Sequence, residues 1–226
     1  ALLSATMPFT AKAQDKVEAS VGADFVSNYI WRGTDCGGVS IQPSMGVSYK
    51  GLSLTAWGSV GIDKEDAREI DLTLGYNTGG FSVSVTDYWF SYHKEDGGYT
   101  GDYFKYGAHS TVHIFEATLG YDFGPLALSW NTYFAGDDYT KENGDRAYST
   151  YVGISAPFKL GGLDWSAEVG LTPWEGAYAN KFNVTNLTLK AEKEIKFTNS
   201  FSLPTFAQVT FNPHTQGAYF VFGVSF

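Results

Sequence analysis

Apolar and polar residues alternate along most of this chain, and a β-strand is the element that places every second side chain on one face. In the stretch EIDLTLGY at 69–76, apolar side chains take the even positions, and polar side chains and glycine take the odd ones. The stretches at 17–25 and 163–171 follow the same rule, whereas no long stretch has the spacing of a helix. The pattern predicts an all-β protein whose strands have one apolar and one polar face.

Twelve strands can be placed on this pattern, and their connections alternate between short and long. The strands are expected at 17–33, 39–49, 52–62, 68–77, 80–92, 109–122, 126–136, 147–158, 163–174, 183–196, 201–212 and 217–226. Two-residue turns such as 50–51 alternate with polar connections such as 93–108 and 136–146. This organisation predicts an up-and-down antiparallel barrel, with tight turns at one end and longer loops at the other.

Hairpin geometry turns the short connections into predictions of register. A two-residue loop at 78–79 places Asp71 opposite Thr86 on the polar face. The long connection 93–108 then folds the next strand back, so that Glu116 lies near Thr86 from the other side. Two carboxylates are therefore expected to flank one threonine.

Neither composition nor hydropathy decides by itself which face of the barrel points outward. Charged residues make up 17% of the chain, below the roughly 25% usual for a soluble domain, and aromatic residues make up another 17%. The mean hydropathy is −0.16, and no apolar run approaches the ~18 residues of a membrane-spanning helix. A soluble barrel keeps its apolar face inside, whereas an outer-membrane barrel turns it outward, and alternation alone does not distinguish them.

Several features favour the outer membrane of a Gram-negative bacterium. The Ala-Lys-Ala sequence at 11–13 fits the small-x-small rule for signal peptidase, so residues 1–13 are expected to be a signal-peptide remnant before a single barrel domain, 14–226. An even number of strands puts both ends at the tight-turn side. Aromatic residues at the ends of the apolar stripes predict an interfacial girdle: Tyr29, Trp31, Tyr49, Tyr76, Phe81, Tyr121, Phe123, Phe158 and Phe226.

The last nine residues, AYFVFGVSF, carry no charge although the chain has a formal charge of −9. Phe220, Phe222 and Phe226 fall on one stripe of this segment, which predicts a closing strand with its apolar stripe toward lipid. A terminal Phe after alternating apolar residues also resembles the signal that outer-membrane proteins present to the barrel-assembly machinery.

The segments SNYIWRG, EIDLTLGY and FVFGVSF resemble the TorF-type porin family of bacteria. The resemblance covers residues 14–226, and its Tyr-x-x-Arg-Gly signature is met by Tyr29, Arg32 and Gly33. It implies an outer-membrane barrel with a role in the passage of solutes. Cys36 lies in the first loop without a role that the family would explain.

The polar face is expected to line a lumen that is richer in acids than in bases. Lys190 should lie diagonally from Glu168 and neutralise it. The alternative to an acidic channel is a lumen whose charges are solvated or paired with one another. Twelve strands fall between filled eight-stranded barrels and open sixteen-stranded porins, so size leaves an open and a plugged lumen both possible. The lumen-facing acids are Glu18, Asp24, Asp71, Glu116, Asp164, Glu168 and Glu192, and the bases are Arg32 and Lys190.

The sequence predicts a channel and not an enzyme. It lacks the Ser-His-Asn arrangement of a barrel phospholipase and the paired acids of a barrel protease, and no cofactor or metal site is expected. Its acidic balance without a basic cluster argues against nucleic acid.

The hypothesis is a monomeric porin-like channel for passive diffusion of small polar or cationic solutes. The alternative is a closed barrel with a structural or surface-binding role, alone or in a larger envelope complex. The expected partners are outer-membrane lipid, lipopolysaccharide and, during insertion, the barrel-assembly machinery.

Overall fold

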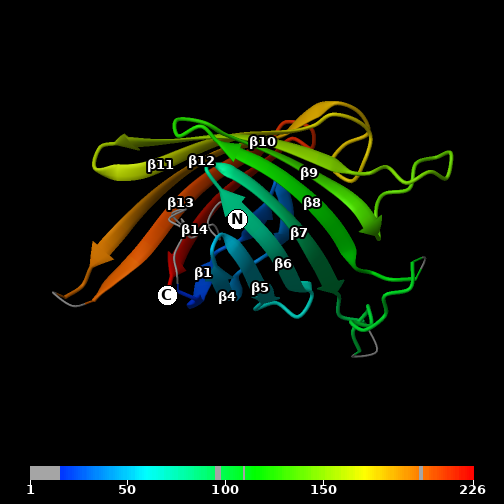
Figure 1. Ribbon diagram of the computed structural model, residues 1–226, viewed down its shortest axis with the longest axis horizontal. Coiled ribbons are helices and arrows are strands. Elements are labelled where there is room, and N and C mark those ends of the chain that lie inside the picture. The colour runs from blue at the N-terminus through cyan, green and yellow to red at the C-terminus, as the bar shows by residue number, and fades with distance from the viewer. Residues whose placement is uncertain (1–15, 95–97, 109, 199–200) are drawn as a thin grey trace.

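The computed structural model describes residues 16–94, 98–108, 110–198 and 201–226. The predicted signal-peptide remnant, residues 1–13, lies outside this part of the chain. Twelve strands pair side by side, each antiparallel to its neighbours, and the first also pairs with the last, so the sheet closes into a barrel (Figure 1). The predicted all-β, up-and-down barrel is confirmed.

Two further strands bring the total to fourteen, and they form a small sheet of their own, β2 (Tyr29–Trp31) with β3 (Thr34–Gly37). Within the described ranges, no helix has the length and apolar character needed to cross a membrane. The barrel strands are β1 (Glu18–Val26), β4 (Ser40–Tyr49), β5 (Leu52–Gly61), β6 (Arg68–Thr78), β7 (Phe81–Ser91), β8 (Ile114–Asp122), β9 (Ala127–Gly136), β10 (Thr150–Leu160), β11 (Leu163–Thr172), β12 (Asn183–Lys196), β13 (Ser202–Asn212) and β14 (Gly217–Ser225).

The alternation in sequence becomes a difference between the two faces of the wall. On β6, Leu72 and Leu74 are exposed on the outside, whereas Glu69 and Asp71 are only 4% and 3% exposed. The same holds on β14, where Phe220 and its even-numbered neighbours face outward. The barrel therefore has an apolar outer wall and a polar interior, the inverse of a soluble protein.

The turn between β6 and β7 differs from the prediction by one residue. It consists of Gly79 and Gly80, with φ angles of 55° and 86°, and not of residues 78–79. Positive φ at both central residues is the geometry of a two-residue hairpin turn that follows the twist of the strands, and glycine adopts it freely. The pairing moves by two positions as a result, so Asp71 lies opposite Tyr88, while each side chain keeps its face.

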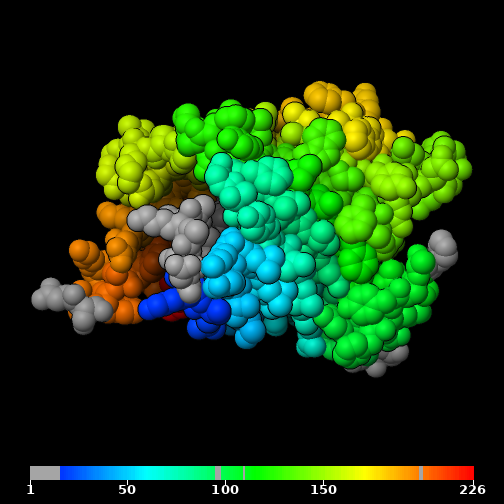
Figure 2. Space-filling model, in the orientation of Figure 1, coloured from blue at the N-terminus to red at the C-terminus, as the bar shows by residue number. Residues whose placement is uncertain are grey.

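Short connections such as 50–51 and 161–162 lie at one end of the barrel, and longer loops such as 92–113 and 137–149 lie at the other. Figure 2 shows these two loops as separate lobes, green and yellow-green, at the end away from the C-terminus labelled in Figure 1. The predicted division into a turn end and a loop end is therefore correct.

The barrel is closed by the first and last strands, as the C-terminal pattern predicts. Phe25 and Val26 pair with Val224 and Gly223, and the backbone nitrogen of Phe226 donates to the carbonyl oxygen of Ala23 at 2.9 Å. This seam is short because the first residues of β1 extend past the end of β14 and have no partner on it.

The first loop is where the structure departs most from the predicted strands. The strand expected at 17–33 ends at Val26, and the chain then turns away from the wall and makes the hairpin β2–β3. Arg32 and Gly33, with φ angles of 50° and 79°, form its two-residue turn. All three residues of β2 are buried, so we name residues 27–39 the inner hairpin.

We expect an Arg on the outer wall to prevent assembly if that wall faces lipid. Leu74 is flanked on the outside by Leu54 and Val85, so Leu74→Arg places a charge among apolar side chains at a cost of about 2–4 kcal/mol. Thr55→Arg on the inner face is the matched control. Yields of heat-modifiable, protease-resistant barrel in the outer membrane measure the effect, and equal yields for both variants would contradict the orientation of the wall.

Candidate functional site: the inner hairpin and the lumen

The inner hairpin is held to the barrel wall by one buried ion pair. The two terminal nitrogens of Arg32 donate to the two carboxylate oxygens of Glu116 on β8, at 2.5 and 2.9 Å. Only 11% of the Arg32 side chain and 1% of the Glu116 side chain are exposed. A two-pronged Arg–carboxylate contact fixes both distance and orientation, so it sets where the hairpin tip lies.

Glu116 is the centre of a wider network of donors. Its Oε1 also accepts hydrogen bonds from the Tyr88 hydroxyl at 2.9 Å and from Thr118 at 3.4 Å. Thr86 lies opposite Glu116 in the sheet, as predicted from the sequence. Because the lone pairs of this carboxylate are shared among several donors, the charge at Glu116 is fully engaged.

Arg32 is enclosed by aromatic rings as well as by its carboxylate. Its guanidinium carbon lies 4.4 Å from the ring centre of Trp31 and 4.7 Å from that of Tyr151. One of its nitrogens donates to the hydroxyl of Tyr178 at 2.6 Å, and that hydroxyl in turn donates to the hydroxyl of Tyr133 at 3.1 Å. Tyr178 belongs to the loop 173–182, so a second loop contributes to holding the hairpin.

The hairpin tip is pressed against the opposite wall. A Cβ atom on Gly33 would lie 1.9 Å from the backbone oxygen of Thr185 on β12, so no larger residue fits there without displacement. The side-chain amide of Asn212, on β13, donates to the carbonyl oxygen of Gly33 at 3.0 Å. The hairpin therefore contacts β8 on one side and β12 and β13 on the other, and it crosses the lumen.

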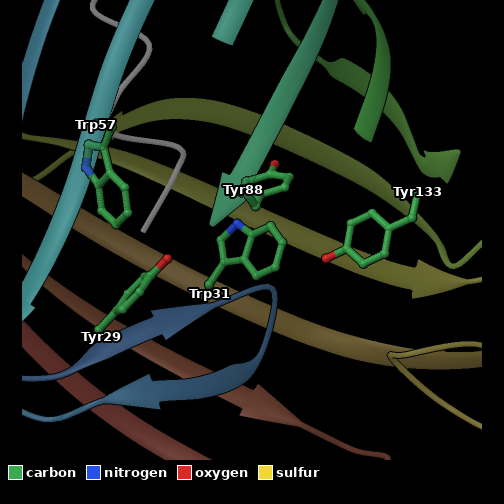
Figure 3. Packing of buried hydrophobic residues seen from close by; sticks show 5 residues of the cluster. All are labelled: Tyr29, Trp31, Trp57, Tyr88 and Tyr133. Atoms are coloured by element: carbon green, nitrogen blue, oxygen red, sulfur yellow. The ribbon is translucent and has the colours of Figure 1, made fainter. Parts of the chain in front are cut away.

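An aromatic cluster fills the space beside the hairpin. Figure 3 shows Tyr29 beneath Trp57, and Trp31 beneath Tyr88, with Tyr133 next to the second pair. The ring centres of Tyr29 and Trp57, and those of Trp31 and Tyr88, are each 5.5 Å apart. Tilted ring pairs at such distances are favourable, and they extend the contact between hairpin and wall.

The sequence assigned Tyr29 and Trp31 to the outer aromatic girdle, and the structure places both inside the barrel. The alternation that predicts them on the outer stripe ends at Val26, where the chain leaves the wall. The other seven predicted girdle residues lie on the outside beside the tight turns and the C-terminus, exposed by 41–72%: Tyr49, Tyr76, Phe81, Tyr121, Phe123, Phe158 and Phe226.

The predicted lumen acids fall into two groups along the barrel. Near the loop end, Asp71 and Glu116 are buried, and near the turn end, 64% of the Asp164 side chain and 53% of the Glu192 side chain are exposed. Glu18 also lies toward the turn end and is exposed. Among the described residues, the interior is therefore solvated toward the turn end and occupied by the inner hairpin toward the loop end.

Several of these acids have partners that the sequence did not reveal. Lys190 pairs with Glu192 on its own strand at 2.5 Å, and the predicted Lys190–Glu168 pair is not formed. Glu168 instead accepts hydrogen bonds from the Tyr151 hydroxyl and, at 3.2 Å, from the Asn186 amide.

Asp164 pairs with Lys159 at 2.7 Å across the turn, and Asp24 lies on the inward face of β1, opposite Gln42. The negative charge of the interior is therefore partly neutralised by its own bases. The acids without a basic partner determine the sign of the remaining charge.

Glu69 and Asp71 form a pair of carboxyl groups two residues apart on the inner face of β6. Both side chains are buried, with 4% of Glu69 and 3% of Asp71 exposed. The Oδ1 atom of Asp71 has no hydrogen-bond partner. Thr185 Oγ1 and Asp66 Oδ2, which also belong to residues in contact with the inner hairpin, are likewise buried without a partner.

Cys36 lies on β3 with a partly buried side chain that packs against the aromatic cluster. Burial, with a smaller contribution from the nearby Glu69, raises the pKa of its thiol from 9.0 to about 12. A thiol in this state reacts slowly, because the thiolate is the reactive form.

A second cluster lies outside the barrel and was missed in the sequence. His113 is fully buried beneath the loop 92–113, with Nδ1 2.6 Å from Asp87 and Nε2 2.7 Å from the carbonyl oxygen of Tyr103. The ring of Tyr106 covers it at 4.3 Å. Because acceptors face both ring nitrogens, the contacts fasten the loop to the outer wall. In the described parts of the chain, no three His, Cys, Asp or Glu side chains are grouped so that they could hold a metal ion.

Breaking the ion pair should expose Cys36. At pH 8 a pKa of about 12 keeps the thiolate fraction about 1,000-fold below that of an ordinary thiol, and the labelling rate should rise about tenfold per pH unit. Arg32→Ala removes the contact with Glu116 and should bring the maleimide-labelling rate toward that of the unfolded chain. Lys159→Ala, which breaks only an exposed pair, is the control, and unchanged labelling of Arg32→Ala would show that the pair does not hold the hairpin.

Comparisons with known proteins show no family for this chain. No protein-family model matches the chain, and no curated protein matches it. Among solved structures, BamA from Haemophilus ducreyi lacking POTRA domains 1–3 is 11% identical with a TM-score of 0.40, over 85% of this chain and 41% of that one. CdiB from Acinetobacter baumannii is 13% identical with a TM-score of 0.42, over 95% and 60%.

The β domain of the Bordetella autotransporter Brka is 14% identical with a TM-score of 0.30, over 92% of this chain and 97% of that one. The chain thus spans less than two thirds of the first two of these proteins. Likenesses at such scores carry no argument about function, and the resemblance to TorF-type porins stays a prediction.

Proposed function

We propose that this protein is an outer-membrane barrel that conducts small polar solutes, with a preference for cations, and that the inner hairpin is its gate. The apolar outer wall supports the location, because exposed Leu, Val and Phe side chains on the barrel strands need an apolar surrounding. Contact with outer-membrane lipid and lipopolysaccharide follows from the same wall, and the barrel-assembly machinery would insert it. The proposal needs neither a cofactor nor a catalytic residue.

The observation that carries the proposal is the way in which the lumen is closed. The closing element includes a short hairpin whose tip is held by the buried Arg32–Glu116 pair and by contacts with Tyr178 and Asn212. The turn end of the interior is solvated and lined by charged residues such as Asp164 and Glu192. We infer that loss of the Arg32–Glu116 contact frees the hairpin tip and widens the polar passage.

The preference for cations rests on the balance of inward charges. Lys190 and Lys159 are each offset by an acid at the turn end, and Arg32 is offset by Glu116. Glu69 and Asp71 remain without a basic partner among the described residues. Acidic side chains in a narrow lumen favour cations, and their field is screened less there than at the surface.

A permanently closed barrel with a structural or surface-binding role is the second candidate. Two observations favour it: the close approach of Gly33 to Thr185, and the burial of the Arg32–Glu116 pair. In that case the loops, and not the lumen, would carry the function.

Conductance in a planar bilayer distinguishes the two candidates. We expect the wild-type barrel to show small or rare openings, and Arg32→Ala to increase the conductance several-fold because the hairpin tip is released. Glu116→Gln should act in the same direction. The reversal potential across a salt gradient should indicate cation preference that weakens at high salt.

The control for the bilayer measurement is Lys159→Ala, which leaves the hairpin contacts intact. A silent Arg32→Ala barrel that is correctly assembled would support the closed barrel instead. Anion selectivity of the open channel would contradict the acidic lumen.

A further inference from the structure

The unpartnered oxygen of Asp71 is the starting point of a second inference. Asp71 is 3% exposed, and its Oδ1 has no hydrogen-bond partner. Buried carboxylate oxygens nearly always have partners, because leaving one without a donor is costly. An oxygen of this kind, directed into the lumen beside the hairpin, indicates a place for a ligand that donates a hydrogen bond.

Aromatic rings surround this carboxylate at the same depth. Trp57 on β5 and Tyr88 on β7 are its direct neighbours in the sheet, one on each side. The inner hairpin adds Tyr29 against Trp57 and Trp31 against Tyr88, as Figure 3 shows. Three different elements thus bring four rings to one carboxylate. Aromatic faces attract cations, and an ammonium group with an alkyl chain gains from both the rings and the acid.

The charge of the site favours a cation. Glu69 and Asp71 are buried two residues apart on the inner face of β6, and neither has a basic partner among the described residues. Arg32 does not neutralise them, because both of its terminal nitrogens are bound to Glu116. A divalent metal ion fits poorly, because no third ligand of the usual kind joins the two acids among the described residues.

We propose that this aromatic cage binds a small alkylammonium ion, with an N–H group donating to Asp71 Oδ1 and the cation against the rings. The cage consists of Tyr29, Trp31, Trp57, Glu69, Asp71 and Tyr88. The inference deepens the proposed function, because it names the class of solute that pauses at the closed end of the lumen. Since Tyr29 and Trp31 belong to the inner hairpin, the ligand contacts gate and wall together.

Calorimetric titration of the purified barrel in detergent micelles tests the cage, with propylammonium chloride as the probe. We expect saturable binding that Asp71→Asn weakens at least tenfold, because the amide keeps the shape and loses the charge. Trp57→Leu should weaken binding by about 3- to 30-fold through the lost cation–π contact. Propanol, which has the same chain without the charge, should not bind.

Asp164→Asn is the matched control, because it removes the same charge from the turn end of the lumen. No saturable binding to the wild type, equal weakening by Asp164→Asn, or comparable binding of propanol would each overturn the proposal. If Asp71→Asn yields no protease-resistant barrel, the comparison of propylammonium with propanol on the wild type decides. Binding without conductance would retain the cage and exclude the channel, whereas conductance without binding would exclude the cage alone.

Discussion

The ion pair between Arg32 and Glu116 determines where the first loop lies, and with it the state of the lumen. A two-stranded hairpin of this size is marginal by itself in water, so its position depends on what it contacts. Removing one partner of a buried pair leaves an uncompensated charge, which typically costs about 3–5 kcal/mol. The pair therefore favours one docked position of the hairpin over the alternatives near it.

The rest of the interior is organised around that contact. Tyr29 and Trp31 reach their partners on β5 and β7 only because the hairpin tip is held across the lumen. The turn end has no such element, and its charged residues remain solvated. In this twelve-stranded barrel one hairpin reaches from β8 to β12 and β13, and wall side chains pack around it.

Sequence reasoning predicted the wall well and the hairpin poorly, for a physical reason. Within a strand that has one apolar and one polar face, the side-chain pattern repeats every two residues. Faces, turns and the closing strand could therefore be placed from the local pattern. The run at 17–33 continues to look like a strand, and nothing nearby shows that it ends at Val26. The partner of Arg32 lies 84 residues away, and such a contact leaves no local pattern. Arg32 and Gly33 stood out as a motif, but their role depends on Glu116 and Thr185.

The position of the hairpin in the chain also determines when it can dock. It follows β1, the first strand, yet the contacts of its tip lie on β8, β12 and β13, which come much later in the chain. Contacts between distant parts of a chain form slowly, because the entropy of closing a long loop is lost before they stabilise anything. The aromatic residues of the hairpin can meet their partners on β5 and β7 early, whereas its tip reaches its final position only when β12 and β13 are in place and the wall is nearly complete.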